Sequence, residues 1–120
     1  MARDHRKLRT FQEADRLVLE VYQLTAGMPV TERFGLQAQI RRSSVSVPTN
    51  LVEGAARPSE GEFVRFLHIA HASARECAYL LSLAPRLGLL NPTDAARLAG
   101  SYNGLSAAIH GLIGGIRKKS

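Results

Sequence analysis

The residues best suited to acid–base, nucleophilic or metal chemistry lie in one stretch of the chain, between His68 and Cys77. His68 and His71 share a helical face, but no Asp or Glu stands at positions 64, 65, 72 or 75, where a helical partner ligand would be. A di-iron carboxylate site needs Glu-x-x-His motifs, and no glutamate here has a histidine three residues later. Cys77 falls on an apolar helical stripe, which favours a core position over a nucleophile.

Motifs that hold nucleotides or activate a serine are also absent. The sequence contains no G-x-x-x-x-G-K-[ST] loop, no G-x-G-x-x-G turn and no G-x-S-x-G elbow. Glu60 and Glu62 are interpreted as acids of a first helical turn rather than as a catalytic pair. We therefore expect a protein that is not an enzyme and that has no cofactor and no metal.

Phosphate binding is the chemistry that the composition favours. The chain carries a formal net charge of +6, and most of its sixteen basic residues are arginines, which suit bidentate phosphate contact. Residues 10–116 contain nine basic and nine acidic residues, so the excess lies in residues 1–9 and 117–120, interpreted as flexible basic tails. The candidate nucleic-acid-binding residues are Arg41, Arg42, Arg57, Arg65, Arg117, Lys118 and Lys119.

Two observations leave this hypothesis open. The sequence shows no aromatic stacking platform of the kind that single-strand-binding proteins use. Arg41 and Arg42 could equally form ion pairs with Glu53, Glu76 or a neighbouring subunit, since arginine is favoured in interface ion pairs. The alternative function is a protein-interaction scaffold or accessory subunit with no direct nucleic-acid contact.

The single cysteine and the opening of the chain favour a cytoplasmic protein. One cysteine cannot form an intrachain disulfide, and no apolar signal segment begins the sequence. The longest uncharged run, residues 98–116, is long enough to span a bilayer, but it contains five glycines and several polar residues. We therefore expect no membrane helix.

Four helices are predicted from apolar residues at three- and four-residue spacing. The first two begin at a capping box from Thr10 to Glu13 and near Thr31, and they end at residues 27–29 and at about Gly54. Their core stripes contain Phe11, Ala14, Leu17, Val18, Val21, Leu24 and Thr25, and Leu36, Ile40, Val47 and Leu51.

The last two helices have clearer ends. A second capping box, from Ser59 to Glu62, begins the third helix, and Gly88 ends it. Asn91 caps the fourth helix, with Pro92 as its first residue. Their core stripes contain Phe63, Phe66, Leu67, Ala70, Ala74, Cys77, Leu81 and Ala84, and Ala95, Leu98, Tyr102, Leu105, Ile109, Leu112 and Ile116. Short connections predict an all-α, antiparallel up-down-up-down four-helix bundle over residues 10–116.

The second predicted helix presents three faces rather than two. Besides its core stripe it has a second apolar strip, formed by Phe34, Val45 and Val52, which indicates contact on two sides. Pro48 removes an intrahelical hydrogen bond and predicts a kink. The third face is polar, and we expect it to form an interhelical network or, alternatively, a merely solvated surface. The predicted network contains Gln39, Arg42, Ser46, Asn50, Glu53, Ser73 and Glu76.

The stretch QIRRSSVSVPTNLVEG, followed by FLHIAHASARE, carries a family resemblance. It resembles the four-helix-bundle proteins encoded in intervening sequences of bacterial large-subunit (23S) ribosomal RNA genes. That family's pattern is Q-I-R-R, S-I-P-x-N-I-x-E-G, F-L-x-I-A and S-x-x-E. The matching residues are Gln39, Ile40, Arg41, Arg42, Ser46, Pro48, Asn50, Glu53, Gly54, Phe66, Leu67, Ile69, Ala70, Ser73 and Glu76. Ala72 and Ala74 depart from the family's usual Gly and Leu.

The resemblance covers about residues 11–116 and implies an antiparallel bundle that assembles as a ring, with five copies expected. It implies little about activity, which is largely unassigned in this family. A group of retroelement accessory variability proteins is similar in fold and binds nucleic acid and a reverse transcriptase. The resemblance is thus compatible with both candidate functions.

The fourth predicted helix independently indicates self-association. Its small residues project within about 100° of one another, opposite the core stripe. Each helical glycine costs about 1 kcal/mol relative to alanine, and small residues at this spacing let another helix approach closely. An exposed face that is polar but uncharged, or a helix broken near Asn103, is the alternative. The full predicted oligomer interface contains Phe34, Val45, Val52, Gly100, Gly104, Ala108, Gly111 and Gly115.

Overall fold

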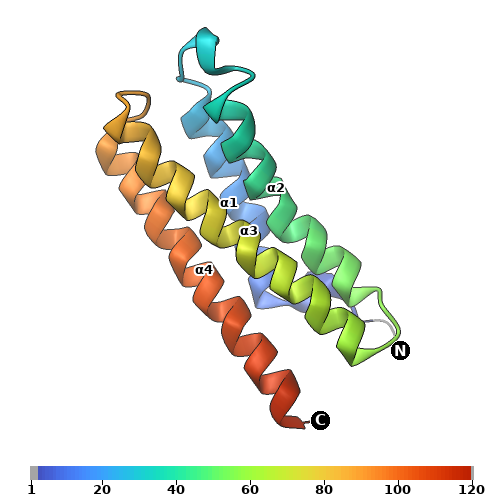
Figure 1. Cartoon of the computed structure of the whole chain (residues 1–120). Coiled ribbons are helices and arrows are strands. Elements are labelled where there is room, and N and C mark those ends of the chain that lie inside the picture. The colour runs from blue at the N-terminus through green and yellow to red at the C-terminus, as the bar shows by residue number, and fades with distance from the viewer. Residues whose placement is uncertain (1–2, 120) are drawn as a thin grey trace.

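The computed structural model describes residues 3–119, and within them the chain forms four α-helices, two short 3-10 helices and no strand (Figure 1). The all-α prediction is therefore confirmed. The bundle measures 47 × 21 × 19 Å. The elements in chain order are η1 (His5–Lys7), α1 (Arg9–Thr25), η2 (Val30–Glu32), α2 (Leu36–Ala55), α3 (Glu60–Arg86) and α4 (Pro92–Lys119).

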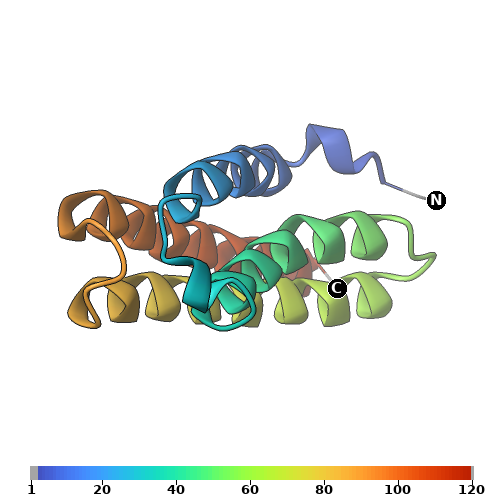
Figure 2. The ribbon, with the colours of Figure 1, turned by 90° about the horizontal axis from the view of Figure 1, so that it is seen from above.

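Each helix runs antiparallel to the one before it (Figure 1). The contacts between α3 and its neighbours α2 and α4 are the most extensive, and α1 closes the bundle by packing against α2 and α4 (Figure 2). With 17 residues, α1 is much shorter than α3, which has 27, and α4, which has 28. The segment before α1 extends along the part of the bundle that α1 does not reach. Its 3-10 helix, η1, contacts both α1 and α2.

The ends of α3 and α4 follow the sequence prediction. The Ser59 hydroxyl accepts the backbone N–H of Glu62 at 3.1 Å, and the Asn91 side-chain oxygen accepts that of Asp94 at 3.0 Å. Gly88 lies just after the end of α3 and has a φ of +74°, a conformation that favours glycine. These local signals are confirmed.

The predicted starts of the first two helices are wrong. Thr10 already lies inside α1, and its hydroxyl is buried without a hydrogen-bond partner, so it does not cap the helix. In α2 the helix starts at Leu36 rather than near Thr31. The Glu32 carboxylate accepts the Leu36 N–H at 3.1 Å and thereby caps α2 from the preceding 3-10 turn.

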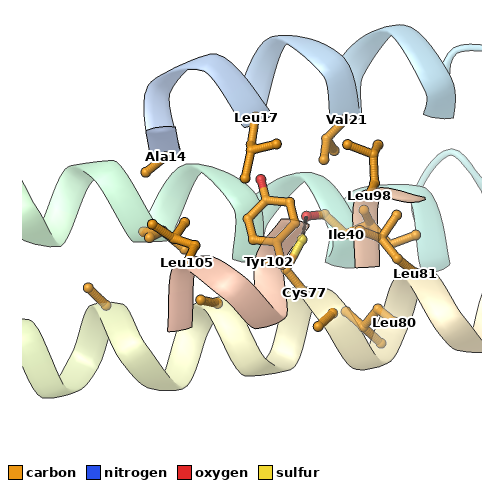
Figure 3. Close-up of a cluster of buried hydrophobic side chains, with 14 of the residues drawn as sticks. Ala14, Leu17, Val21, Ile40, Cys77, Leu80, Leu81, Leu98, Tyr102 and Leu105 are labelled. Atoms are coloured by element: carbon orange, nitrogen blue, oxygen red, sulfur yellow. Dashed lines mark hydrogen bonds between the residues drawn. The ribbon is translucent and has the colours of Figure 1, made fainter. Parts of the chain in front are cut away.

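The predicted core stripes meet in one apolar interior. Leu17, Ile40, Leu67 and Leu98 are fully buried and bring one side chain from each helix to the centre. Tyr102 is also fully buried, with its ring near Cys77 and its hydroxyl directed toward α1 (Figure 3). Near the end of α4 the prediction needs correcting. Ile113 is buried there, whereas Leu112 and Ile116 are only partly buried.

Gly54 allows α2 and α3 to approach closely. It is buried, and a Cβ at this position would lie 2.8 Å from the Cβ of Phe66 and 3.1 Å from the ring of Phe63. Because such distances are well inside van der Waals contact, a larger residue would force the two helices apart.

No helix among residues 3–119 combines the length and the apolar character needed to cross a membrane. The uncharged run of residues 98–116 lies instead within α4, with one side in the bundle core.

Candidate nucleic-acid interface

The polar face of α2 meets α3 through three of the predicted residues. The hydroxyls of Ser46 and Ser73 are hydrogen-bonded at 2.8 Å. The Asn50 amide donates to the Ser46 carbonyl at 2.8 Å and to the Ser46 hydroxyl at 3.1 Å. These side chains therefore tie α2 to α3 in a partly buried position rather than facing water alone.

The other predicted members of the network are arranged differently. Gln39, Arg42 and Glu76 line the same open pocket as Ser46 and Ser73, of about 430 Å³. Glu53 lies outside this pocket and pairs instead with Arg57 at 3.1 Å, one helical turn away. The structure thus brings Glu53 into an exposed ion pair and not into the α2–α3 network.

Pro48 is buried inside α2, and the helix continues through it to Ala55. Since proline has no N–H, the Ser44 carbonyl lacks its usual intrahelical donor. The Ser44 hydroxyl donates to the Arg41 carbonyl at 2.7 Å, and the Thr49 hydroxyl donates to the Val45 carbonyl at 2.8 Å. Side-chain hydroxyls therefore bond to carbonyls on either side of the altered turn, and the kink remains a prediction.

Both basic termini lie at one end of the bundle, beside the α2–α3 connection (Figure 1). The Arg3 N–H donates to the Ala55 carbonyl at 2.9 Å, and the Arg3 guanidinium lies 4.2 Å from the ring of Phe63. At the other terminus, a guanidinium nitrogen of Arg117 lies 3.2 Å from His68 Nε2. We call this region the basic end, and it contains Arg3, Arg6, Lys7, Arg57, Arg65, Arg117, Lys118 and Lys119.

Among the described residues, both predicted tails contain helical structure, and their flexibility remains a prediction. Residues 3–8 pack along the bundle and include η1, and α4 continues as far as Lys119. Met1, Ala2 and Ser120, which belong to the predicted tails, lie outside the described residues. The described part of each predicted tail therefore belongs to the bundle.

Arg57 and Arg65 flank a single aromatic ring at the basic end. Their guanidinium carbons lie 5.1 and 5.3 Å from the ring centroid of Phe66. Arg57 also pairs with Glu53, whereas Arg65 has no carboxylate within 4 Å in the described chain. The two residues therefore belong to one site but differ in how far their charge is neutralised.

Arg41 and Arg42 lie in the first half of α2, away from the basic end. Arg41 Nε donates to the Thr25 hydroxyl at 2.9 Å, and its Nη2 donates to the Tyr22 carbonyl at 3.2 Å. The Arg41 guanidinium also lies 4.3 Å from the Tyr22 ring. The predicted nucleic-acid-binding residues thus divide into two groups rather than forming one patch.

The small residues of α4 face outward from the bundle. We call this surface the α4 glycine face, and it consists of Gly100, Gly104, Ala108, Gly111 and Gly115, all exposed. A Cβ added at any of its four glycines would meet nothing within 4 Å. Beside it, a groove of about 580 Å³ separates Gly104 and Ala108 from the start of α1.

The remaining predicted interface residues are not on α4. Phe34 precedes α2 and is 89% exposed, so it does not belong to a strip on that helix. Phe34 and Val45 line a groove with Tyr22, and Val52 is half-buried. Two exposed aromatic residues, Tyr22 and Phe34, therefore lie in one groove, an arrangement that the sequence pattern did not indicate. In the sequence, the adjacent Arg33 and Phe34 are the feature that could have indicated this groove.

The surroundings of Cys77 and His71 shift the pKa values of both side chains. Burial raises the pKa of the Cys77 thiol to about 11, which suppresses the reactive thiolate. Burial, together with His110, Arg75 and His68, lowers the pKa of His71. Among residues 3–119 no three His, Cys, Asp or Glu side chains converge on a common point.

Comparison with known proteins agrees with this architecture. A family model described as "23S rRNA-intervening sequence protein" matches residues 6–111, which confirms the family resemblance. The fold is similar to the crystal structure of a protein with unknown function from the S23 ribosomal protein family of Bacteroides thetaiotaomicron, with a TM-score of 0.80. That likeness covers 87% of this chain and 97% of the other at 20% identity, and so concerns the fold alone. No curated protein matches the chain.

Proposed function

This chain belongs to the family of 23S rRNA-intervening sequence proteins, and we propose that it is a non-enzymatic, ring-forming helical bundle that binds RNA or DNA through basic residues. The observation that supports binding is the gathering of both termini with Arg57 and Arg65 at the basic end. The proposal places the protein in the cytoplasm and requires no cofactor.

Among residues 3–119, two ion pairs neutralise basic side chains at the basic end. Arg6 pairs with Asp4 at 2.9 Å and Arg57 pairs with Glu53 at 3.1 Å. Among residues 3–119, the basic side chains of the basic end outnumber the carboxylates of the same segments, which are Asp4, Glu53, Glu60 and Glu62. Phosphate contacts release counterions from nucleic acid without reading its sequence, so such a cluster suits binding of low sequence specificity.

Assembly would multiply this modest charge. Four helical glycines on the α4 glycine face cost about 4 kcal/mol relative to alanines, and in the protomer they contact nothing that requires them. A neighbouring subunit packed closely against this face would provide the compensation. The family resemblance supports a ring of five copies, in which symmetry would repeat the basic end five times.

A salt titration tests nucleic-acid binding directly. The wild-type chain should bind fluorescent random-sequence RNA and DNA at low salt, with an affinity that falls steeply as salt rises. The double variant Lys118→Gln with Lys119→Gln should flatten the slope of log K against log salt by about 1.4 for single strands. Arg86→Gln, at the opposite end of α3, is the control and should leave the slope nearly unchanged.

Absence of binding by the wild type at low salt would contradict this function. It would favour the scaffold or accessory subunit, in which the basic end contributes only solubility. Binding that is equally strong in low and high salt would also contradict it, because phosphate contacts depend on counterion release.

A further inference from the structure

The groove between the end of α1 and the start of α2 is lined by both aromatic and positively charged side chains. We call it the Tyr22–Phe34 groove; its volume is about 450 Å³, and no Asp or Glu of the described chain lines it. Its principal lining residues are Tyr22, Arg33, Phe34, Arg41, Arg42 and Val45. This combination distinguishes it from the basic end, where carboxylates accompany the basic residues.

Both aromatic residues of the groove are exposed to solvent. Phe34 is 89% exposed and Tyr22 is 41% exposed. Phe34 lies in the connection before α2, so its ring stands outside the bundle and does not contribute to the core. A guanidinium accompanies each ring, with Arg33 at 5.5 Å from the Phe34 centroid and Arg41 at 4.3 Å from the Tyr22 centroid.

The positive charge of the groove is not offset by close carboxylates. Arg41 is held by the Thr25 hydroxyl and the Tyr22 carbonyl, both of them neutral. No carboxylate of residues 3–119 lies within ion-pair distance of Arg33, Arg41 or Arg42, in contrast to Arg16, which pairs with two glutamates. The neighbouring Glu32 carboxylate caps α2, and Glu76 shares the adjoining α2–α3 pocket with Arg42.

Exposed π faces beside fixed guanidinium groups are the two elements that bind unpaired nucleotides. Bases stack on aromatic rings in any sequence, and guanidinium groups bind the phosphates between them. In a duplex the base faces are already stacked on one another, so such a groove discriminates in favour of single strands.

We infer that the Tyr22–Phe34 groove binds an unpaired segment of RNA or DNA, with a base stacked on an exposed ring and adjoining phosphates on its three arginines. The inference rests on the proposed nucleic-acid function and assigns it a site and a preferred strand state. It gives the groove a role separate from that of the basic end, which would contact phosphates of single and double strands alike.

Fluorescence anisotropy with the full chain tests this assignment. The probes are a labelled oligouridylate, an oligothymidylate and a blunt DNA duplex of equal length. Phe34→Ala should weaken binding of both single strands about tenfold and leave duplex binding unchanged. Phe34→Tyr should bind like the wild type, because an aromatic face is retained. A larger loss on the oligouridylate than on the oligothymidylate would assign the groove to RNA, and the reverse to DNA.

Matched control variants distinguish an effect of the groove from the general effect of losing an aromatic ring or a positive charge. Tyr79→Ala removes an aromatic side chain, 57% exposed, from α3 and should change single-strand affinity less than twofold. Arg41→Gln should weaken single-strand binding and flatten its salt slope by about 0.7, whereas Arg75→Gln, an equal charge change on α3, should not. Far-ultraviolet circular dichroism verifies that each variant folds, as expected for changes outside the core.

The outcomes distinguish this inference from the function on which it rests. If the wild type binds no probe at low salt, both fail. If the wild type binds but Phe34→Ala binds the single strands equally well, the groove assignment fails and the function stands. If Phe34→Ala changes the native mass of the protein, the ring belongs to a subunit contact, and the groove assignment is likewise overturned.

Discussion

Glycines serve opposite purposes on α2 and α4. Gly54 lies in the seam between α2 and α3, where a Cβ would meet Phe66 at 2.8 Å. The glycines of the α4 glycine face look onto open space, and a Cβ there would meet nothing within 4 Å. The same residue type is thus required by the protomer in one place and is unexplained by the protomer in the other.

The difference shows where the fold depends on close approach and where it does not. At Gly54 the absence of a side chain is a condition of packing inside a single chain. On α4 it costs helix stability, and no close contact among the described residues requires it, so the proposed subunit contact would provide the compensation. The variants below test this contrast, from the largest expected effect to the smallest.

Gly54→Leu should be the most damaging change. The added side chain cannot fit between α2 and the Phe63–Phe66 turn of α3, so the helices must separate, with a loss of about 3 kcal/mol or more in the free energy of unfolding. Chemical denaturation measures the loss. Gly61→Leu, at an exposed site on α3 with nothing within 4 Å, is the control, and an equal loss there would refute the packing role of Gly54.

Gly104→Glu should separate subunits without unfolding them. A carboxylate placed in a close helix contact is desolvated and repels its symmetry mates, which should weaken assembly by about 2 kcal/mol or more. Sedimentation should show a smaller particle while circular dichroism retains its helical signal. Gly61→Glu makes the same substitution outside the α4 glycine face and should preserve the native mass; an unchanged mass for Gly104→Glu would contradict the proposed contact.

Ser73→Ala should have a moderate effect on the α2–α3 seam. It removes the 2.8 Å hydrogen bond to Ser46, which keeps its contact with Asn50, and should cost about 1 kcal/mol in the free energy of unfolding. Ser82→Ala, at an exposed site on the same helix, should cost less than about 0.5 kcal/mol. Equal losses in the two variants would show that the seam gains nothing from this bond.

Tyr102→Phe should have the smallest effect on stability. Tyr102 lies on the core-facing side of α4. The Tyr102 hydroxyl is fully buried without a hydrogen-bond partner, and burial raises its pKa because the phenolate cannot be solvated there. Removing the oxygen leaves no polar group unsatisfied, so the free energy of unfolding should stay the same or rise by up to about 1 kcal/mol. A loss above about 1 kcal/mol would mean that the hydroxyl is bonded.

Local side-chain signals explain how much of the fold was predictable. Ser59 and Asn91 cap helices through bonds to residues three positions ahead, so their roles follow from sequence. Thr10 has the same chemistry but packs into the bundle, and the cap of α2 comes from Glu32 in a short 3-10 turn. The error at Thr10 arose because tertiary packing overrode local preference, whereas the error at α2 arose because the 3-10 turn and its Glu32 cap were not recognised.

The candidate site was predictable only in part. Helical spacing placed Ser46, Asn50 and Ser73 correctly on facing surfaces, because α2 stays helical through Pro48 and α3 is helical around Ser73. The Tyr22–Phe34 groove was missed because a helix starting near Thr31 would place Phe34 on its apolar strip. In the structure Phe34 precedes the helix, so no helical periodicity could position its ring.

The native mass of the wild-type chain, measured by sedimentation over a wide range of protein concentration, tests the proposed assembly most directly. The contrast between Gly54 and the α4 glycine face predicts a stable particle larger than the 13.1 kDa protomer, and the family resemblance sets its expected mass at about five times that value. A single 13.1 kDa species that persists at high concentration would contradict it, since the glycines of α4 would then face water with nothing to compensate them.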